Sequence, residues 1–154
     1  MTGLLDRIED ARAKGDVIDK PDVFCSIVAG DVDAEIVYED DVAVAFLDHR
    51  PVFLGHTLVA PRVHIETLAD LPPSLVGPFF AAAQRVARAV ESGLEADGSF
   101  VAINNKVSQS VPHLHTHVVP RRRKDGLRGF FWPRQKYRDA SQMAEVAALI
   151  RAAL

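Results

Sequence analysis

The chain has 154 residues, of which 48% are hydrophobic and 25% charged, and its formal net charge is −3 at pH 7. This length suits one domain with a core of its own, and the acidic balance argues against a general binder of nucleic acids or membrane surfaces. The single cysteine, Cys25, cannot form an internal disulfide, and no apolar run approaches the roughly 20 residues of a membrane span, so a cytoplasmic globular protein is expected.

The first half of the chain changes from helical to strand periodicity. Helical spacing predicts a short helix at residues 4–11 and a second at 21–28 that ends at Gly30. Short β-type runs then predict strands at 35–38, 42–47 and 57–60. The acidic residues 39–41 between the first two of these runs indicate a hairpin turn.

The second half contains the strongest helical pattern, between Pro72 and Gly98. Its apolar residues recur at intervals of three and four, at Leu75, Phe79, Ala82, Val86 and Val90. Two more strands are expected at 99–103 and 115–119, and Ser141 is expected to cap a last helix through Leu154. Strands interrupted by one long helix favour an antiparallel α+β fold over a doubly wound parallel one.

Positive charge gathers near the carboxyl end of the chain. The residues are Arg121, Arg122, Arg123, Lys124, Arg128, Arg134, Lys136 and Arg138. Two interpretations are open: a solvated loop that offsets acidic charge elsewhere, or a rim that attracts polyphosphate.

Three of the six histidines occupy alternate positions, at His113, His115 and His117. On a strand, residues two apart point to the same face, so the three imidazoles are expected to line one surface. Such a row suits proton chemistry near neutral pH or a catalytic zinc ion.

The stretch from Ser110 to Arg121 resembles the signature of the histidine triad (HIT) superfamily of nucleotide hydrolases and transferases. Five upstream segments are also similar to family segments and follow the family order: 24–30, 34–40, 45–48, 55–59 and 61–65. The resemblance implies one HIT-like domain over residues 1–154, made of an N-terminal helical extension (1–20), a core (21–121) and a basic, aromatic tail (122–154). It also implies a five-stranded antiparallel sheet with a long helix, continued across a homodimer.

The resemblance assigns the chemistry to five residues. His115 is the implied nucleophile, which attacks the α-phosphorus and forms a covalent nucleotidyl-imidazole. His117 is expected to donate to phosphate oxygens, and His113 to hold the other two in register. His56 is expected to orient the second nitrogen of His115, and Ser110 to donate to the phosphate or the leaving group.

Substrate binding is implied for a second set of residues. Asp48 matches the ribose-binding carboxylate of the family, and Asn104 matches an amide that binds phosphate. Phe24, Ile27 and Phe46 are expected to form an apolar slot for a purine. Their alternative role is ordinary core, which is favoured for Ile27.

The sequence departs from the family pattern at two places that bear on the substrate, and it has a tryptophan outside the shared signature. The loop 105–109, which includes the substrate-binding candidate Gln109, is short and has no glycine, so Lys106 is expected to compensate by charge. His49 stands where the family has an aliphatic residue, and it is a candidate contact to sugar or base. Trp132 is a candidate to reach the active site of a neighbouring subunit, although packing against its own domain is an equal alternative.

A metal site is also suggested by the resemblance. Many bacterial family members bind structural zinc through a C-x-x-C pair and two histidines. Here Asp22 replaces the first cysteine, which leaves Asp22, Cys25, His64 and His113 as a mixed site. No cofactor is expected to be required for the reaction.

The leading functional hypothesis is a nucleoside phosphoramidase that releases AMP. A hydrolase or phosphorylase of diadenosine tri- or tetraphosphate is the alternative, and a non-catalytic nucleotide-binding regulator is a second. A third is a metal enzyme with zinc on the three alternate histidines. In each nucleotide-dependent case the partners are a purine nucleotide and a second copy of the chain, without nucleic acid or membrane.

Overall fold

The computed structural model describes residues 22–127 and 135–154. The helix expected at 4–11 and the side chain of Trp132 lie outside these residues. The chain divides into two compact units, the second of which begins at Lys124. None of the described helices is both long and apolar enough to cross a membrane.

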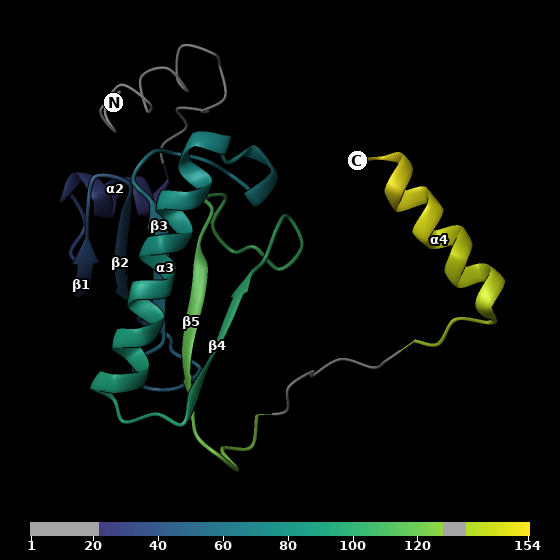
Figure 1. Cartoon of the computed structure of the whole chain (residues 1–154). Helices are drawn as coiled ribbons and strands as arrows, with labels where there is room; N and C mark the ends of the chain where they lie inside the picture. The colour runs from purple at the N-terminus through teal and green to yellow at the C-terminus, as the bar shows by residue number, and fades with distance from the viewer. Residues whose placement is uncertain (1–21, 128–134) are drawn as a thin grey trace. The chain divides into compact units, whose positions relative to one another are not determined.

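The first unit is an α+β structure built on an antiparallel sheet, as the sequence predicts. Its elements are α2 (Val23–Ala29), β1 (Ile36–Glu39), β2 (Ala43–Leu47), β3 (Thr57–Pro61), η1 (Leu68–Asp70), α3 (Pro73–Gly93), β4 (Gly98–Ile103) and β5 (Thr116–Arg121). The five strands lie in the order β1-β2-β3-β5-β4, and every neighbouring pair is antiparallel. Figure 1 shows α3 running along one face of this sheet.

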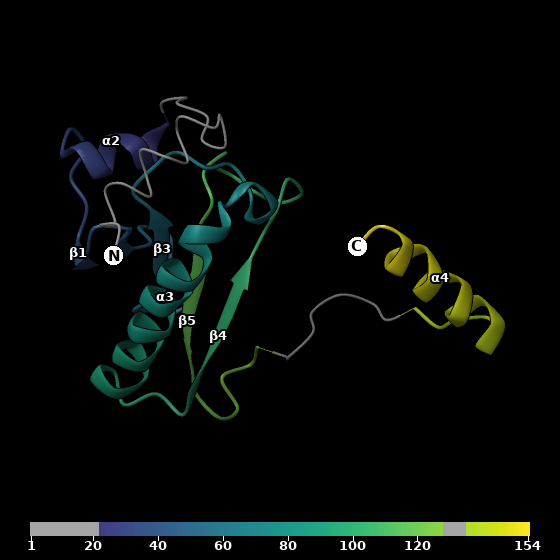
Figure 2. The same ribbon diagram turned by 45° about the horizontal axis from the view of Figure 1, so that its top comes forward.

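The sheet is covered on both faces, and this explains the unbroken apolar run of β2. Ala43 and Ala45 join the core beneath α3, whereas Val44 and Phe46 join a smaller core with Phe24 of α2 on the opposite face. Figure 2, which brings the top of the molecule forward, shows α2 and α3 on different sides of the strands. A strand buried on both faces reads as a continuous apolar segment instead of an alternating one.

Helix α3 packs through the predicted apolar stripe. Leu75, Phe79, Ala82, Val86 and Val90 are all buried. Phe79 has no exposed surface and Leu75 has 1%, so this face supplies much of the larger core. The amphipathic pattern is therefore confirmed residue by residue.

The ends of the shorter elements follow side-chain chemistry. Helix α2 begins after Asp22 and ends at Gly30, whose φ of 81° is the left-handed conformation expected of a helix-terminating glycine. The hairpin between β1 and β2 is confirmed. Its turn is fixed by Asp40, whose carboxylate accepts the backbone N–H groups of Val42 and Ala43, each at 2.8 Å.

The second unit contains helix α4 (Ala140–Ala152), and here the expected cap is wrong. Asp139 is the N-cap residue, with extended backbone, and its carboxylate accepts the N–H of Gln142 at 2.8 Å. Ser141 already lies in the first turn, where its hydroxyl contacts Glu145. A cap must precede the helical φ and ψ angles, so the earlier of the two polar residues takes the position.

Candidate active site

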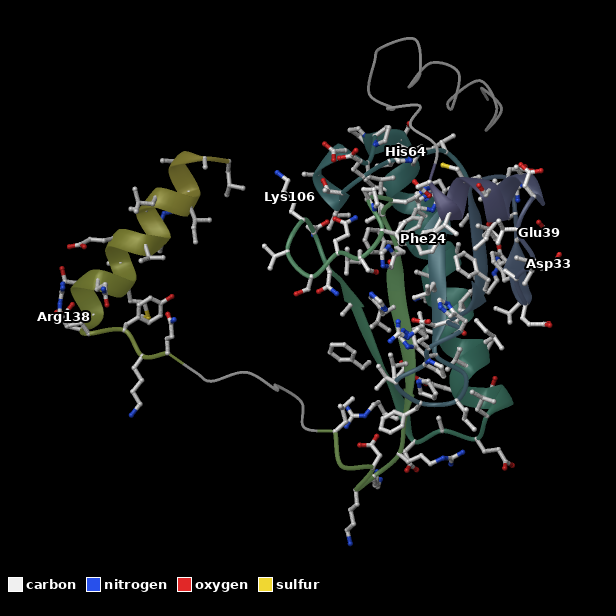
Figure 3. All side chains as sticks on the ribbon, turned by 180° about the vertical axis from the view of Figure 1, so that it is seen from behind. Phe24, Asp33, Glu39, His64, Lys106 and Arg138 are labelled. Carbon is white, nitrogen blue, oxygen red and sulfur yellow. The ribbon has the colours of Figure 1, made fainter. Side chains whose placement is uncertain are left out.

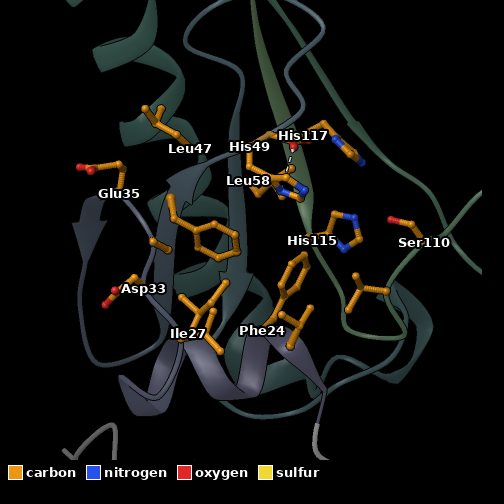
Figure 4. A pocket seen from close by; sticks show the side chains of 16 residues that line it. Phe24, Ile27, Asp33, Glu35, Leu47, His49, Leu58, Ser110, His115 and His117 are labelled. Carbon is orange, nitrogen blue, oxygen red and sulfur yellow. Dashed lines mark ion pairs between the residues drawn. The ribbon is translucent and has the colours of Figure 1, made fainter.

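A cavity of about 920 Å³ opens on the α2 side of the sheet (Figure 4). Its lining residues come from α2, the segment before β1, β2 with the residues after it, β3, and β5 with the segment leading into it. They are Val23, Phe24, Ile27, Val32, Asp33, Ala34, Glu35, Phe46, Leu47, Asp48, His49, Leu58, Ser110, Val111, His115 and His117. Figure 4 shows Ser110 on one side of His115, and Phe24 and Ile27 on the other.

Most of the predicted site residues meet in this cavity, including the five from the purine slot and the ribose corner, Phe24, Ile27, Phe46, Asp48 and His49. Asn104 and Gln109 are not among the lining residues. The amide of Gln109 is used within the protein, because it donates to the Glu66 carbonyl at 2.6 Å and accepts the Lys106 N–H at 2.8 Å. Sequence reasoning did not assign four apolar lining residues, Val23, Leu47, Leu58 and Val111, or residues 32–35 to the site.

The predicted common face of the three histidines is confirmed, although β5 itself begins only at Thr116. Leu114 points into the core beneath α3. On the opposite side, the Phe24 ring contacts the rings of both His113 and His115, with centroids 5.8 and 5.1 Å away. The ring of His117 lies 4.9 Å from that of His115.

The tautomer of His115 is fixed by the main chain. Its Nδ1 lies 2.6 Å from the carbonyl oxygen of His113. A carbonyl oxygen only accepts hydrogen bonds, so Nδ1 carries the hydrogen and Nε2 of the neutral ring keeps its lone pair. The expectation that His56 orients this nitrogen is therefore wrong, because the backbone of His113 does so.

His56 instead pairs with His117. Its Nε2 lies 2.9 Å from Nδ1 of His117, and its own Nδ1 accepts the N–H of Val52 at 3.2 Å. Since that Nδ1 is an acceptor, Nε2 of neutral His56 donates to His117. Nε2 of His117 is left with a hydrogen to donate, which suits a group that binds phosphate oxygens.

Burial keeps this histidine pair uncharged at neutral pH. It lowers the pKa of His117 to about 4, with a further lowering by the nearby His115 and His56 rings. It also lowers the pKa of His56, although the Asp48 carboxylate opposes the shift. Both rings therefore act as neutral hydrogen-bonding groups under physiological conditions.

The lowered pKa of His117 predicts acid sensitivity of the fold. Between pH 6.5 and about 4 the unfolded chain protonates this ring and the folded chain does not, so stability is full above pH 6.5 and falls as the pH drops. We expect urea denaturation to show about 2 kcal/mol less stability at pH 5 than at pH 7. The variant His117→Asn should flatten this dependence, and an equal slope in the variant would contradict the assignment.

Two of the charged features do not reach the cavity. Lys106, with a φ of 66°, extends its side chain from its loop into solvent (Figure 3). Arg122 donates to the carbonyl oxygens of Glu95 and Leu94 beyond the end of α3. It follows β5 at the end remote from His117, about 17 Å away along the strand. Arg122 is therefore not part of a basic rim that could attract polyphosphate to the cavity.

Two groups of potential metal ligands occur in the described part of the chain, and neither contains His115. One is Asp48, His56 and His117, and the other is Asp22, Cys25, His64 and His113. The hypothesis of zinc shared by the three alternate histidines is wrong, because His115 Nδ1 serves the backbone and His113 turns its ring toward Asp22. The second group matches the mixed site expected from the sequence.

The atoms of this second group fit a zinc ion. Zinc bonds of about 2.3 Å to sulfur and 2.0 Å to nitrogen, at tetrahedral angles, place the two ligand atoms about 3.5 Å apart. Cys25 Sγ lies 3.5 Å from His64 Nδ1 and 3.7 Å from His113 Nδ1. Asp22 Oδ2 lies 2.7 and 3.1 Å from the same two nitrogens.

Hydrogen bonding around the group also calls for a cation. His113 Nε2 donates to the Pro61 carbonyl at 2.8 Å, so its Nδ1 is an acceptor that faces the Asp22 carboxylate. Burial lowers the pKa of His113 despite opposing contributions from the Pro61 carbonyl and Asp22. Burial alone would raise the pKa of Asp22, but backbone N–H groups and His113 bring it below its usual value. Two hydrogen-bond acceptors, His113 Nδ1 and the Asp22 carboxylate, therefore face each other. A cation bound between them would remove the repulsion between their lone pairs.

Residues 29–124 match the family model described as the HIT domain. The chain belongs to the HIT family. It is 44% identical over 109 residues to an uncharacterized HIT-like protein of Mycobacterium tuberculosis, covering 70% of this chain and 76% of that one.

HIT proteins of known structure have the same fold. A HIT family protein from Bacillus subtilis superposes with a TM-score of 0.80 at 36% identity, covering 88% of this chain and 98% of that one. A histidine triad family protein from Mycobacterium smegmatis, described as zinc-bound, gives a TM-score of 0.64 at 43% identity, covering 84% and 96%. That neighbour and the second group of potential ligands together permit a structural zinc ion in this HIT protein.

Two other relatives in the family carry hydrolase names. An adenylylsulfatase of Arabidopsis thaliana is 30% identical over 120 residues, which cover 77% of this chain and 61% of that protein. An asymmetrical bis(5′-nucleosyl)-tetraphosphatase of Schizosaccharomyces pombe is 32% identical over 96 residues, covering 61% and 53%. These relatives support hydrolase activity in general.

Proposed function

We propose that this HIT protein is a nucleoside phosphoramidase, which releases a nucleoside monophosphate from an amine. The observation that carries the proposal is the fixed tautomer of His115, which presents the Nε2 lone pair from the wall of the cavity. Phe24, Ile27 and Phe46 offer a slot for a purine beside it, and Asp48 a carboxylate for the ribose hydroxyls.

The proposed reaction has two displacements. His115 Nε2 attacks the α-phosphorus, and the P–N bond breaks with its electron pair going to the amine nitrogen. The nitrogen takes up a proton from solvent as the bond breaks, while the hydroxyl of Ser110 donates a hydrogen bond to it as its charge develops. Water then attacks phosphorus and releases a proton to solvent, and the Nε2–P bond breaks, which returns the lone pair to His115 and yields the monophosphate.

The charges around the cavity favour an amine over a polyphosphate as leaving group. No lysine or arginine is found among the described residues that line it, whereas Asp33, Glu35 and Asp48 are. His117 adds no positive charge, because its pKa is lowered to about 4. A polyphosphate would bring several negative charges into this setting, but an amine would leave as a neutral or cationic group.

A direct comparison of substrates tests the proposal. The pure protein is incubated with AMP-lysine and, separately, with diadenosine tri- and tetraphosphate, and the products are followed by ion-exchange chromatography. We expect kcat/KM to be at least about 100-fold higher for the phosphoramidate, corresponding to about 2.7 kcal/mol in the transition state. Faster cleavage of either dinucleotide would establish the alternative activity. Binding of AMP without turnover of any substrate would establish a regulatory role.

We further propose that Asp22, Cys25, His64 and His113 hold a structural zinc ion. When bound, zinc would supply a cross-link between α2, the segment after β3 and the segment before β5. His115 and His117 are outside this group of ligands, and no cofactor takes part in the proposed displacements.

A homodimer is also part of the proposal. β4 forms one edge of the sheet, pairing only with β5 among the described strands, and Val101 on it is 49% exposed. An open edge of this kind can pair with the same strand of a second copy and continue the sheet. Light scattering after gel filtration is expected to give the mass of two chains, and a monomer would contradict this arrangement.

A further inference from the structure

Helix α2 forms one wall of the cavity and packs on the sheet through few residues. It is seven residues long, and Phe24 is its only buried residue, with Ile27 and Val28 partly buried against the same core. Val23, Phe24 and Ile27 all line the cavity. A helix this short gains little stability from its own hydrogen bonds, so its position depends on what it is attached to.

The group of metal ligands attaches α2 to the rest of the first unit. Asp22 Oδ1 accepts the N–H groups of Phe24 and Cys25, at 2.7 and 3.0 Å, and so caps the helix. Oδ2 of the same carboxylate faces His64 and His113. Both histidine side chains are almost wholly buried, with 2% and 0% exposed.

The ring of His64 is oriented so that only one of its two nitrogens faces this group of ligands. Its Nδ1 faces Asp22 and Cys25, while its Nε2 is buried without a hydrogen-bond partner in the described part of the chain. Figure 3 shows His64 near the end of the sheet where α2 begins. The Asp22 carboxylate thus contacts both the first N–H groups of α2 and the histidines of this group of ligands, which is called the cluster below.

Two contacts join the cluster and α2 to the proposed nucleophile, His115. The Phe24 ring stands edge-on to His115, with centroids 5.1 Å apart. The carbonyl of His113, whose ring belongs to the cluster, accepts the hydrogen of His115 Nδ1. A shift of α2 or of His113 would therefore alter the purine slot and the orientation of His115 together.

From this arrangement we infer that zinc at Asp22, Cys25, His64 and His113 clamps α2 in place, and that metal occupancy thereby controls the affinity of the cavity for nucleotide. The choice of AMP as the ligand rests on the proposed function. The effect of zinc on the position of α2 does not depend on that function. Asp22 makes the coupling direct, because one side chain both caps the helix and faces the metal ligands.

The test uses the full chain, stripped with a chelator or reloaded with Zn²⁺. Elemental analysis gives the metal content, calorimetry the Kd of AMP, and hydrogen exchange the protection of residues 22–30. We expect one zinc per chain, an AMP Kd at least about 10-fold tighter in the loaded protein, and slower exchange in α2 after loading.

Two matched variants separate the metal from the helix cap. Asp22→Asn retains a capping side chain but removes the charged ligand, so it should lower zinc affinity and weaken AMP binding. Asp139→Asn makes the same change at the N-cap of α4, which belongs to neither group of potential metal ligands in the described part of the chain, and it should alter neither quantity.

The outcomes distinguish this inference from the proposed function. Equal AMP affinity and equal α2 exchange with and without zinc, or no zinc binding at all, would overturn the clamp. If neither form binds AMP, the proposed function and the coupling to it fall, and the exchange of α2 still decides whether zinc clamps the helix.

Discussion

Replacing His115 with alanine is expected to lower kcat/KM for AMP-lysine by at least about 1000-fold, as found when a covalent nucleophile is removed. The structure gives the reason for so large a loss. His115 is the cavity residue whose tautomer is set by a backbone carbonyl, and neutral His117 has its Nδ1 engaged by His56. We expect no neighbouring imidazole to take its place.

The measurement pairs kinetics with detection of the intermediate. Mass spectrometry of wild type quenched in alkaline denaturant, in which a phosphorus–imidazole bond survives, should show a nucleotide adduct on the protein, and the His115→Ala variant should show none. Thermal denaturation of the variant at pH 7 controls for loss of fold. Retention of more than a tenth of wild-type activity would exclude His115 as the nucleophile.

His117→Ala should be less severe, because it removes a donor and leaves the nucleophile. A single donor to developing charge is typically worth 100- to 1000-fold in kcat, or about 3 to 4 kcal/mol. The ordering of the two variants therefore distinguishes covalent attack from stabilisation of charge. Equal loss in both would argue that the two rings act as one unit.

The fold was largely predictable because its signals are local. The stripe from Leu75 to Val90 is set by helical periodicity, and each of its residues is buried. The alternation through His113, His115 and His117 likewise fixed which side chains share a face, since this depends only on extended backbone. In both cases the residues that matter are neighbours in the sequence.

The partners of the histidines were not predictable from local patterns. Strands β3 and β5 pair with Leu58 opposite His117. His56 lies two residues before Leu58 and on the same face, so it is a diagonal neighbour of His117. The register of distant strands is not a property of either segment. The choice between the two interpretations of Arg122 could not be made from the sequence for the same reason, since its carbonyl partners lie beyond the end of α3.

The second large effect is expected at Phe24, where stability and the site depend on one side chain. Phe24 is 5% exposed, and its ring contacts Phe46, His113 and His115. Replacement by alanine should lower the free energy of unfolding by about 3 kcal/mol or more. Because α2 has no other buried residue, the folded variant should also lose nucleotide affinity.

Phe79→Ala is the matched control for this effect. Phe79 belongs to α3 and is fully buried between this helix and the sheet, in the core on the face opposite to Phe24 and His115. Its loss should cost about 3 to 5 kcal/mol, yet leave the AMP Kd of the folded protein within about twofold. Urea denaturation measures the first quantity and calorimetry at low temperature the second. If both variants weakened AMP binding equally, the site would depend on global stability; if only Phe24→Ala did, α2 would be an element whose placement determines affinity.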